Sequence, residues 1–461
     1  MTVLGGQAAC AAASVITEIC YARLLGPAGR GQISLCMMAI GLGVLVGGLG
    51  GEGTIILWGS DPERKRTAWL PAVTFWGVIG STVSSCAWAA VYWDWHPAFL
   101  RGITPPLAEL VTAMIPLSVA FGYMMAMLTG SERFRLRASL ALVSQVAELA
   151  GVVMLLMLLG PRAEWALCGN LLGLVVGGSV TAVLIRKSFR RMGRFNSALK
   201  SLGPTLSYGI RGQLGLLATF FNYRLDIFIV NYFLDPAQVG LYALGVVVSE
   251  GLWQIPSAAA VALFPRTART VEVGAAEFTC LILRQVFLIA SVTGVLMAIF
   301  SPLLIPAVFG QRFSPSVAVI WWILPGTIAL SMGKVACSDL AGRGKNGYSS
   351  AFAAVALVVT IVLDWLLIPR MGIRGAALAS SAAYLTDSVL ILMALKYELK
   401  VGWRSLLVPT SGEFAHYRRA FLQLREWLWP AALSANGGPP RPSLISVAST
   451  KLNDGSAHGE R

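Results

Sequence analysis

The sequence predicts an all-α integral membrane protein, in which about twelve transmembrane helices form two six-helix lobes related by a parallel pseudo-repeat. Composition is the first reason: 56% of the 461 residues are hydrophobic and only 13% are charged. Soluble globular proteins carry about 25% charged residues, so this chain has too little polar surface for a water-facing fold. The other two reasons are the recurrence of long apolar segments and the alternation of Lys and Arg between the loops that join them.

The apolar segments each reach the roughly 20 residues that cross a bilayer. In the first lobe, expected at 1–186, they lie near 3–22, 32–57, 69–93, 107–129, 138–160 and 164–185. In the second lobe, expected at 205–396, they lie near 205–233, 239–264, 281–308, 316–338, 349–368 and 375–395. A basic inter-lobe loop at 187–204 and a tail at 397–461 complete the chain. Because Met1–Ala9 carries no basic residue, the first segment is expected to be a span and not a signal peptide.

Lys and Arg are distributed unevenly between the two sets of loops. If the N-terminus is cytoplasmic, seventeen lie in inner loops and seven in outer loops, and this asymmetry predicts that both termini are cytoplasmic. It also explains the net charge of +14 without a nucleic-acid partner. The inner residues are Arg64, Lys65, Arg66, Arg133, Arg135, Arg137, Arg186, Lys187, Arg190, Arg191, Arg194, Lys200, Arg266, Arg269, Arg284, Arg343 and Lys345. The outer residues are Arg23, Arg30, Arg101, Arg162, Arg312, Arg370 and Arg374.

The two halves also share short sequence matches. Residues 25–31 (LGPAGRG) match residues 234–240 (LDPAQVG), each segment following the first span of its half. Gly130 and Arg133 match Gly342 and Lys345 at a nearly equal offset. Since each half has an even number of spans, the repeat is expected to be parallel, an arrangement that many secondary transporters use for alternating access.

The tail divides into two parts. Aromatic and leucine residues recur at helical spacing through 405–430 with arginines between them, which favours a helix on the cytoplasmic membrane surface. A plain solvated linker is the alternative. From Ser434 onward the composition is rich in Gly, Pro and Ser and predicts disorder.

No cofactor or metal site is predicted. The seven cysteines lie in or beside apolar stretches without a C-x-x-C pair, and the glycine-rich segment 41–53 lacks the G-x-x-x-x-G-K-[ST] pattern of a phosphate loop. Close helix packing is therefore the expected role of these glycines.

Several segments resemble the polysaccharide exporter and O-antigen (lipid-linked oligosaccharide) flippase family of the multidrug/oligosaccharidyl-lipid/polysaccharide exporter superfamily. ARLLGPAGRGQIS (22–34) is similar to the end of the first helix and the following turn in that family, and YRLDIFIVNYFLDPAQVGLYALG (223–245) to the seventh helix and the next turn. VFGQRFSPSVAVIWWILPG (308–326), LAGRGKNGYSS (340–350) and PRMGIRGAALASSAAYL (369–385) resemble the ninth to twelfth helices. The resemblance covers residues 10–396. It implies a two-lobed, V-shaped transporter of lipid-linked saccharide in the bacterial inner membrane, with membrane lipids and polysaccharide synthesis enzymes as partners.

Ionisable groups inside spans are the candidate site residues, since each costs several kcal/mol unless it faces a cavity or a partner. At 100° per residue, Arg211, Asn222 and Asp226 share one face of the span 205–233. This face is expected to line the substrate cavity, with Arg211 attracting phosphate and Asp226 binding a coupling cation or proton. An Arg–Asp pairing between helices is the structural alternative. Arg224 points to the opposite face, where it is expected to pair with another helix or to reach the interface.

Other polar residues extend this candidate site. Glu250 and Gln254 share a stripe of the eighth span, Glu18 lies on the first span, and Gln145 and Glu148 share a face of the fifth. Glu250 and Asp387 are further coupling-ion candidates. Hydrogen bonds between packed helices are the alternative for all of these residues. Four charged residues lie near span ends and are expected to reach the interface: Glu52, Lys334, Asp339 and Asp364.

Three functions are consistent with this pattern. A flippase for lipid-linked oligosaccharide in O-antigen, capsule or exopolysaccharide synthesis fits the resemblance best. A cation-coupled multidrug exporter of the same superfamily is the second, although acidic residues should then dominate the cavity. An integral-membrane saccharide polymerase or glycosyltransferase is the third, but the chain shows no long outer loop with paired carboxylates, and no enzyme activity is expected.

Overall fold

Helices account for nearly all of the computed structural model, which describes residues 3–60, 70–95, 97–190, 202–253, 275–345 and 347–407. These residues contain no β-strand and confirm the all-α prediction. Residues up to Leu407 form one compact unit, and the predicted tail helix lies outside the described residues except for 405–407.

The first half of the chain supplies long helices joined by short helical turns. The helices are α1 (Val3–Cys20), α2 (Gly26–Gly47), α3 (Gly51–Ser60), α4 (Leu70–Ala90), α5 (Pro105–Gly130), α6 (Phe134–Leu159) and α7 (Ala163–Arg190). The turns are η1 (Tyr21–Leu25), η3 (Val91–Trp95) and η4 (Ala98–Leu100).

The second half repeats this plan. Its helices are α9 (Leu202–Phe233), α10 (Pro236–Glu250), α12 (Ala275–Phe309), α13 (Ser316–Gly342), α14 (Gly347–Met371), α15 (Ile373–Leu399) and the short α16 (Trp403–Leu407). The turns η6 (Gly251–Trp253) and η7 (Gln311–Phe313) follow α10 and α12.

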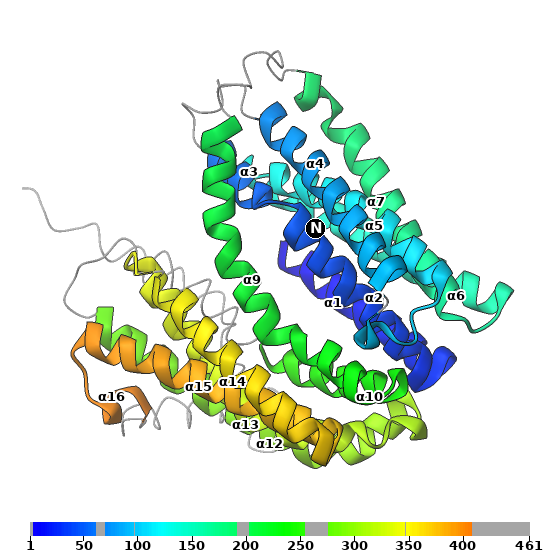
Figure 1. The fold of residues 1–461 in the computed structure, drawn as a ribbon. Helices are drawn as coiled ribbons and strands as arrows, with labels where there is room; N and C mark the ends of the chain where they lie inside the picture. Colours follow the sequence, from blue (N-terminus) through cyan, green and yellow to red (C-terminus); the bar gives the residue numbers. More distant parts are fainter. Residues whose placement is uncertain are drawn as a thin grey trace, which may run out of the picture. The chain divides into compact units, whose positions relative to one another are not determined.

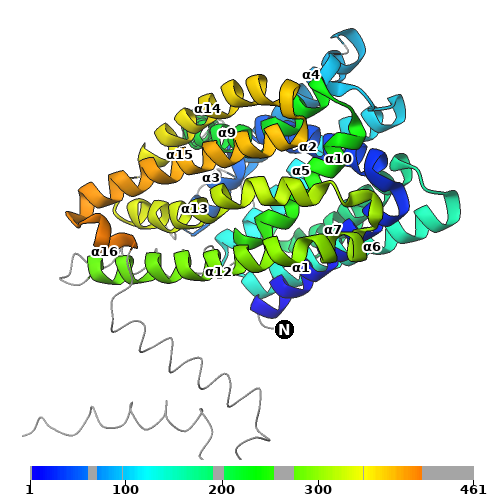
Figure 2. The ribbon, with the colours of Figure 1, turned by 90° about the horizontal axis from the view of Figure 1, so that it is seen from below.

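Each half packs largely within itself. In the first half α6 contacts α1 and α7, and α5 contacts α4 and α7; in the second half α15 contacts α13 and α14, as Figure 2 shows. Contacts between the halves run along α2 and α9: α2 packs on both α9 and α10, while α9 also reaches α3 and α4 (Figure 1). The division into two lobes joined by a loop at 187–204 remains a prediction.

The predicted spans follow the observed helices with one exception where the structure describes them, whereas residues 254–264 of the expected eighth span lie outside the described part of the chain and the total of twelve stays a prediction. Nine stretches of the described residues are long and apolar enough to cross a membrane, and the first of them, Gly5–Gly47, joins α1 and α2. The chain is therefore a multi-pass membrane protein. The expected span 32–57 is wrong as a single helix: it breaks between Gly47 and Gly51, where Leu49 and Gly50 adopt φ values of 46° and 70°. A side chain on Gly50 would overlap with the backbone of Gly209 in α9, so the break is fixed by close packing.

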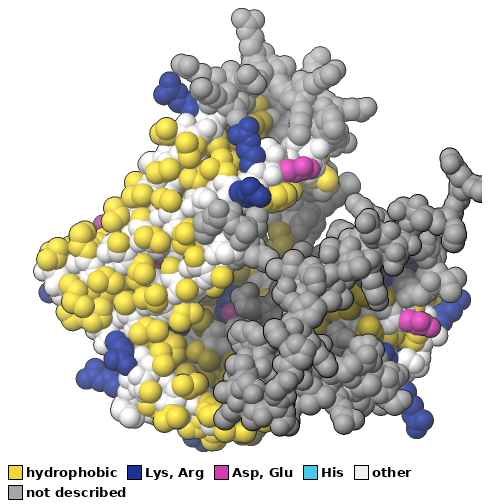
Figure 3. Space-filling view, turned by 180° about the vertical axis from the view of Figure 1, so that it is seen from behind, with side chains coloured by type: hydrophobic (Ala, Val, Ile, Leu, Met, Phe, Trp, Pro, Cys, Tyr) yellow, Lys and Arg dark blue, Asp and Glu magenta, His cyan; other side chains and the backbone are white. Residues whose placement is uncertain are grey.

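The outer surface is apolar, as expected for helices in lipid. Large hydrophobic side chains are more than two-thirds exposed on α6, α7 and α12, among them Leu158 (74%), Val183 (70%) and Leu303 (69%). Figure 3 shows a broad hydrophobic surface with Lys and Arg near its edges.

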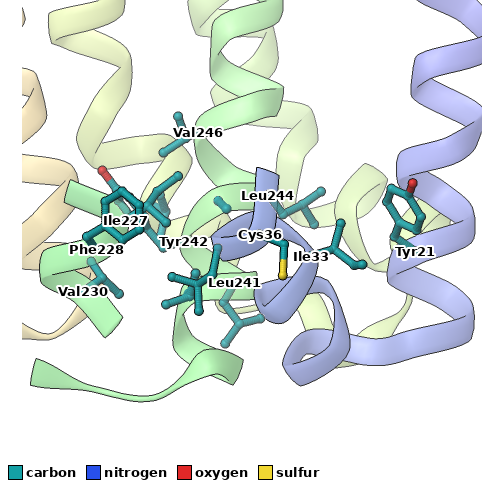
Figure 4. Packing of buried hydrophobic residues seen from close by; sticks show 14 of the residues in the cluster. Tyr21, Ile33, Cys36, Ile227, Phe228, Val230, Leu241, Tyr242, Leu244 and Val246 are labelled. Carbon is teal, nitrogen blue, oxygen red and sulfur yellow. The ribbon is translucent and has the colours of Figure 1, made fainter. Parts of the chain in front are cut away.

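The buried core centres on the crossing of α2 and α10. Ile33 and Cys36 of α2 lie beside Leu241 and Leu244 of α10 (Figure 4), and all four belong to the largest cluster of buried side chains. Because the first turns of these two helices are the matched repeat segments 25–31 and 234–240, the repeat joins the two halves by direct contact.

Candidate functional site

A polar pocket of about 270 Å³ lies inside this helical unit. Six helices and the turn η1 surround it: α1, η1, α2, α6 and α7 from the first half, and α9 and α10 from the second. The pocket is thus formed where the two halves of the chain meet. Its polar lining residues are Ser14, Thr17, Glu18, Tyr21, Arg30, Ser34, Gln145, Glu148, Asn170 and Arg224.

Arg30 and Glu18 form an ion pair on one wall of the pocket. The Arg30 Nη2 lies 2.8 Å from Glu18 Oε2, and its Nε donates a second hydrogen bond to the same oxygen at 3.2 Å. Arg30 is 2% exposed, whereas the Glu18 side chain is 30% exposed. The guanidinium is therefore held in place, while the carboxylate keeps one side open to the pocket.

A second acidic group lies on α6. Gln145 donates a hydrogen bond to Glu148 at 3.2 Å, and Glu148 lies within electrostatic range of Glu18. Next to them, the Tyr21 hydroxyl donates a short hydrogen bond to Asn170 Oδ1. This part of the wall can accept hydrogen bonds or bind a cation.

Arg224 supplies the positive charge from the second half of the chain. Its Nη2 lies 2.8 Å from Glu250 Oε2, with side-chain exposures of 26% and 15%. The other Glu250 oxygen, Oε1, is buried and has no hydrogen-bond partner among the described residues. Among the described residues, only one oxygen of the carboxylate that holds Arg224 is therefore hydrogen-bonded.

Beside this pair, Lys334 of α13 packs against aromatic rings. Its Nζ lies 4.2 Å from the ring centroid of Trp253 and 5.3 Å from that of Tyr223. Glu250 and Asp387 lie within electrostatic range of it. Lys334 therefore meets aromatic rings and carboxylates within the helical unit, which does not support the expectation that it reaches the membrane interface.

Deeper in the second half, two carboxylates are buried close to each other. Asp226 is 1% exposed and accepts hydrogen bonds from the Tyr242 and Ser380 hydroxyls, the second at 3.1 Å, and from the Ile227 amide at 2.8 Å. Asp364 of α14 is 0% exposed, and neither of its oxygens has a hydrogen-bond partner in the described part of the chain. The two groups lie within electrostatic range of each other, and burial disfavours two negative charges at such a place.

The predicted site residues differ in how they lie relative to the pocket. Glu18 lines the pocket directly, and Glu250 adjoins it through Arg224. Asn222 and Asp226 do not line it: the face they share is packed against α14 and α15, where Asn222 accepts a hydrogen bond from Thr360 at 3.1 Å. Their assignment to the substrate cavity stays a prediction, since a polar helix face can bind another helix as well as line a cavity.

Asp387, the third coupling-ion candidate, is 5% exposed and lies near Lys334, with its Oδ1 unpartnered among the described residues. The side chain of Arg211 and the whole of Gln254 lie outside the described residues, so their roles stay predictions.

Sequence reasoning misplaced three further charged residues. Arg30 was expected in an outer loop, yet it lies in the first turns of α2 and is buried. Asp364 was expected to reach the interface, but it lies at the centre of a helix contact. Asp339, expected at the interface as well, is buried and pairs with Arg343 at 2.7 Å. The sequence repeat could have indicated that Arg30 is important, since Arg30 directly precedes Gly31, one of the matched glycines.

Comparison with known proteins agrees with this architecture. The family described as polysaccharide biosynthesis protein matches residues 2–271. A curated relative, the probable low-salt glycan biosynthesis flippase Agl15 of Haloferax volcanii, is 22% identical over 291 residues. That match spans 60% of this chain and 60% of the relative.

Solved structures of transporters share the fold. A lipid II flippase, MurJ, in an inward closed conformation superposes with a TM-score of 0.68 at 14% identity, covering 86% of this chain and 87% of that one. An inward-facing multidrug resistance transporter of the MATE family superposes with a TM-score of 0.62 at 15% identity, covering 84% and 94%. At such low identity these structures establish the fold alone.

Proposed function

This chain belongs to the polysaccharide biosynthesis protein family, and we propose that it moves lipid-linked oligosaccharide across a bacterial cytoplasmic membrane during the synthesis of a surface polysaccharide. The family prediction made from helix-end motifs is thereby confirmed. The observation that supports the function most directly is the pocket between the halves, in which Arg30 and Arg224 come from opposite halves of the chain.

The chemistry of such a substrate fits this pair of arginines. A lipid-linked saccharide carries phosphate between a polar head and a hydrocarbon tail, and the phosphate must be shielded from lipid during transfer. Guanidinium groups bind phosphate through paired, charge-assisted hydrogen bonds. Because each arginine here is already paired with a glutamate, a phosphate that bound the guanidinium would compete with that carboxylate, and a released carboxylate would need a proton or a cation.

Alternating access is the mechanism we propose for the transfer. The two arginines lie on different halves, so separation of the halves at one end would open the pocket to one side of the membrane. The buried pair Asp226 and Asp364 is our candidate for coupling, since binding of a proton or a monovalent cation there would change the packing of α9 against α14. Close contact between Gly50, just before α3, and Gly209 of α9 supports a closed arrangement at the other end.

We further place both termini in the cytoplasm, following the distribution of Lys and Arg. Polysaccharide synthesis enzymes are the expected protein partners, because their lipid-linked product is the proposed substrate.

A cation-coupled multidrug exporter is the second candidate. The acidic pair of Glu18 and Glu148 on the pocket wall favours it, since a cationic drug would find two carboxylates there. The two arginines oppose it. The polymerase and glycosyltransferase alternatives lose support, because the family match and the shared fold are those of transport proteins.

Deletion of the gene, followed by analysis of lipid-linked intermediates and surface polysaccharide, tests the proposal. Accumulated lipid-linked oligosaccharide and loss of surface polymer are expected, with rescue by the unmodified gene. Unchanged glycolipids together with new sensitivity to cationic drugs would instead select the multidrug exporter.

A further inference from the structure

The outer ends of α2 and α10 cross in unusually close contact. A side chain on Gly31 would overlap with the carbonyl oxygen of Pro236, and a side chain on Gly240 would overlap with that of Pro27. The contact is reciprocal, because these residues occupy matching positions of the sequence repeat. We call residues 27–31 and 236–240 the outer crossing.

Arg30 belongs both to the outer crossing and to the polar pocket. Its Nη1 donates a hydrogen bond to the carbonyl oxygen of Gly240 at 3.2 Å, across the two halves of the chain. The same nitrogen lies 3.2 Å from Ser34 Oγ, while Nε and Nη2 face Glu18. One buried guanidinium thus links the pocket wall to the contact that closes it.

Other bonds between the halves strengthen this end. Arg23 donates hydrogen bonds to the carbonyl oxygens of Val308, at 2.7 Å, and Ala307, at 2.5 Å, at the end of α12. Asn231 donates to the carbonyl oxygens of Phe99 and Arg101 at 2.7 and 2.9 Å. Unlike Arg30, neither residue lines the pocket, so a ligand in the pocket would contact neither side chain.

We propose that Arg30 couples occupancy of the polar pocket to opening of the outer crossing. This inference rests on the proposed function for the anionic character of the ligand. A phosphate group in the pocket competes for the Arg30 guanidinium, draws it away from the Gly240 carbonyl, and removes a hydrogen bond that holds the two halves together at this end.

The competition favours the phosphate on chemical grounds. A bond from guanidinium to phosphate is ionic on both sides and can be bidentate, whereas the Gly240 carbonyl is neutral and accepts a single bond. An empty pocket leaves Arg30 on Gly240 and Glu18, and the crossing stays closed. A ligand in the pocket weakens the outer crossing, so that the crossing opens after the ligand has bound.

Accessibility of a cysteine inside the pocket tests the coupling. All seven native cysteines are replaced by alanine, and the substitution Met38→Cys places a single thiol in the pocket lining. Intact cells or oriented vesicles are then treated from each side with a membrane-impermeant maleimide. The probe ligand is geranyl diphosphate, a short prenyl chain with an anionic head. We expect it to raise labelling of the introduced thiol from the outer side in the otherwise unmodified protein.

Two further variants separate the closing contact from the coupling. Arg30→Gln is expected to raise outer labelling about tenfold without ligand, the change that loss of one charged hydrogen bond produces, and to abolish the response to geranyl diphosphate. Gly31→Ala is expected to raise labelling with or without ligand, because its Cβ cannot fit the closed crossing. Gly53→Ala is the matched control, since a Cβ there meets nothing within 4 Å.

Unchanged outer labelling in Arg30→Gln, at normal membrane abundance, overturns the inference. So does a full response to geranyl diphosphate in that variant, or no response in the protein with Arg30. If Gly31→Ala fails to accumulate, the Arg30 results alone decide. A failure of the proposed function appears differently, as normal surface polysaccharide after gene deletion, and leaves these labelling results standing.

Discussion

Two arginines of this protein, one in each half, are held by glutamates of the same half. Arg224 and Glu250 lie 2.8 Å apart on neighbouring helices, and Arg30 and Glu18 repeat the arrangement in the first half. Removing one partner leaves the other uncompensated, which costs about 3–5 kcal/mol in buried pairs. Such pairs can be exchanged for a ligand only if the ligand supplies equivalent charge.

The first prediction concerns Arg224. Arg224→Ala is expected to abolish transport and to destabilise the protein by roughly 3–5 kcal/mol, because Glu250 loses its counter-ion. The double variant Arg224→Gln with Glu250→Gln should recover most of the stability, since neutral amides can hydrogen-bond to each other, but not transport. Thermal unfolding of the purified protein and the amount of surface polysaccharide measure the two effects. Full transport by the double variant would contradict the role of Arg224 in phosphate binding.

A second prediction concerns the buried carboxylates. If Asp226 and Asp364 share a bound cation, sodium chloride should raise the melting temperature of the purified protein relative to choline chloride at equal ionic strength. Asp364→Asn should remove this difference, because it removes one of the two charges. Asp94→Asn, which changes an exposed carboxylate, is the control and should keep it. A sodium effect that persists in Asp364→Asn would exclude the site, and an effect of pH in place of sodium would identify the shared ion as a proton.

At this scale the sequence revealed which residues were charged and within a span, but not which neighbours they meet. Glu18 lies at the polar pocket, as its place on a single helix allowed us to expect, and its role there stays a prediction. Asp226 lies away from this pocket, because its partners Tyr242 and Ser380 are on two other helices. Helical periodicity defines a polar face, whereas the identity of what that face contacts depends on tertiary packing.

Helix ends determine how the elements connect. Asp235 caps α10: its Oδ1 accepts hydrogen bonds from the amides of Ala237 and Gln238 at 2.8 and 3.1 Å, and Pro236 occupies the first turn. These residues end α9 and start α10 within a few positions, which brings Gly240 to the crossing with α2. A cap at this position therefore supports the contact between the halves.

The third prediction follows from this cap. Asp235→Ala should destabilise the protein by about 1 kcal/mol, as loss of a helix N-cap does, whereas Asp235→Ser should retain most of the stability because its hydroxyl can accept the same bonds. Thermal unfolding of both variants in the same detergent provides the comparison. Equal losses in the two variants would show that the carboxylate charge matters and not the cap.

Within the described residues, most expected spans matched helices because the length of an apolar segment can be read directly from the sequence. The exception at 32–57 has a physical cause: Gly48, Leu49 and Gly50 are apolar or neutral, so nothing in hydropathy marks the break between α2 and α3. The break depends on Gly209, more than 150 positions away. Two backbones approach this closely only in the folded chain. The sequence shows only the glycine that each segment needs for the contact.

For the whole molecule, the apolar exterior and the basic loops specify its place in the bilayer. Arg30 and Arg284, counted as loop residues from the sequence, are in fact buried in helices, at 2% and 8% exposure. Without Arg284 in the inner count and Arg30 in the outer count, sixteen basic residues remain in the inner loops and six in the outer loops. The asymmetry therefore does not depend on the residues that were misplaced, and the cytoplasmic position of both termini stays a prediction.

The last prediction tests that orientation. Alkaline phosphatase, which is active only outside the cytoplasm, is fused after Arg133 or after Gly160, in the two consecutive loops that follow α5 and α6. Activity is expected only in the Gly160 fusion, because the turn after α5 and the first turn of α6, residues 131–137, carry three arginines and should remain inside. Replacing Arg133, Arg135 and Arg137 by glutamine should weaken the preference of this segment for the cytoplasm without changing the apolar spans. Some phosphatase activity should then appear in the fusion after residue 133. The opposite pattern, with activity only after Arg133, would reverse the topology, place the outer crossing on the cytoplasmic side, and require the direction of transfer to be assigned anew.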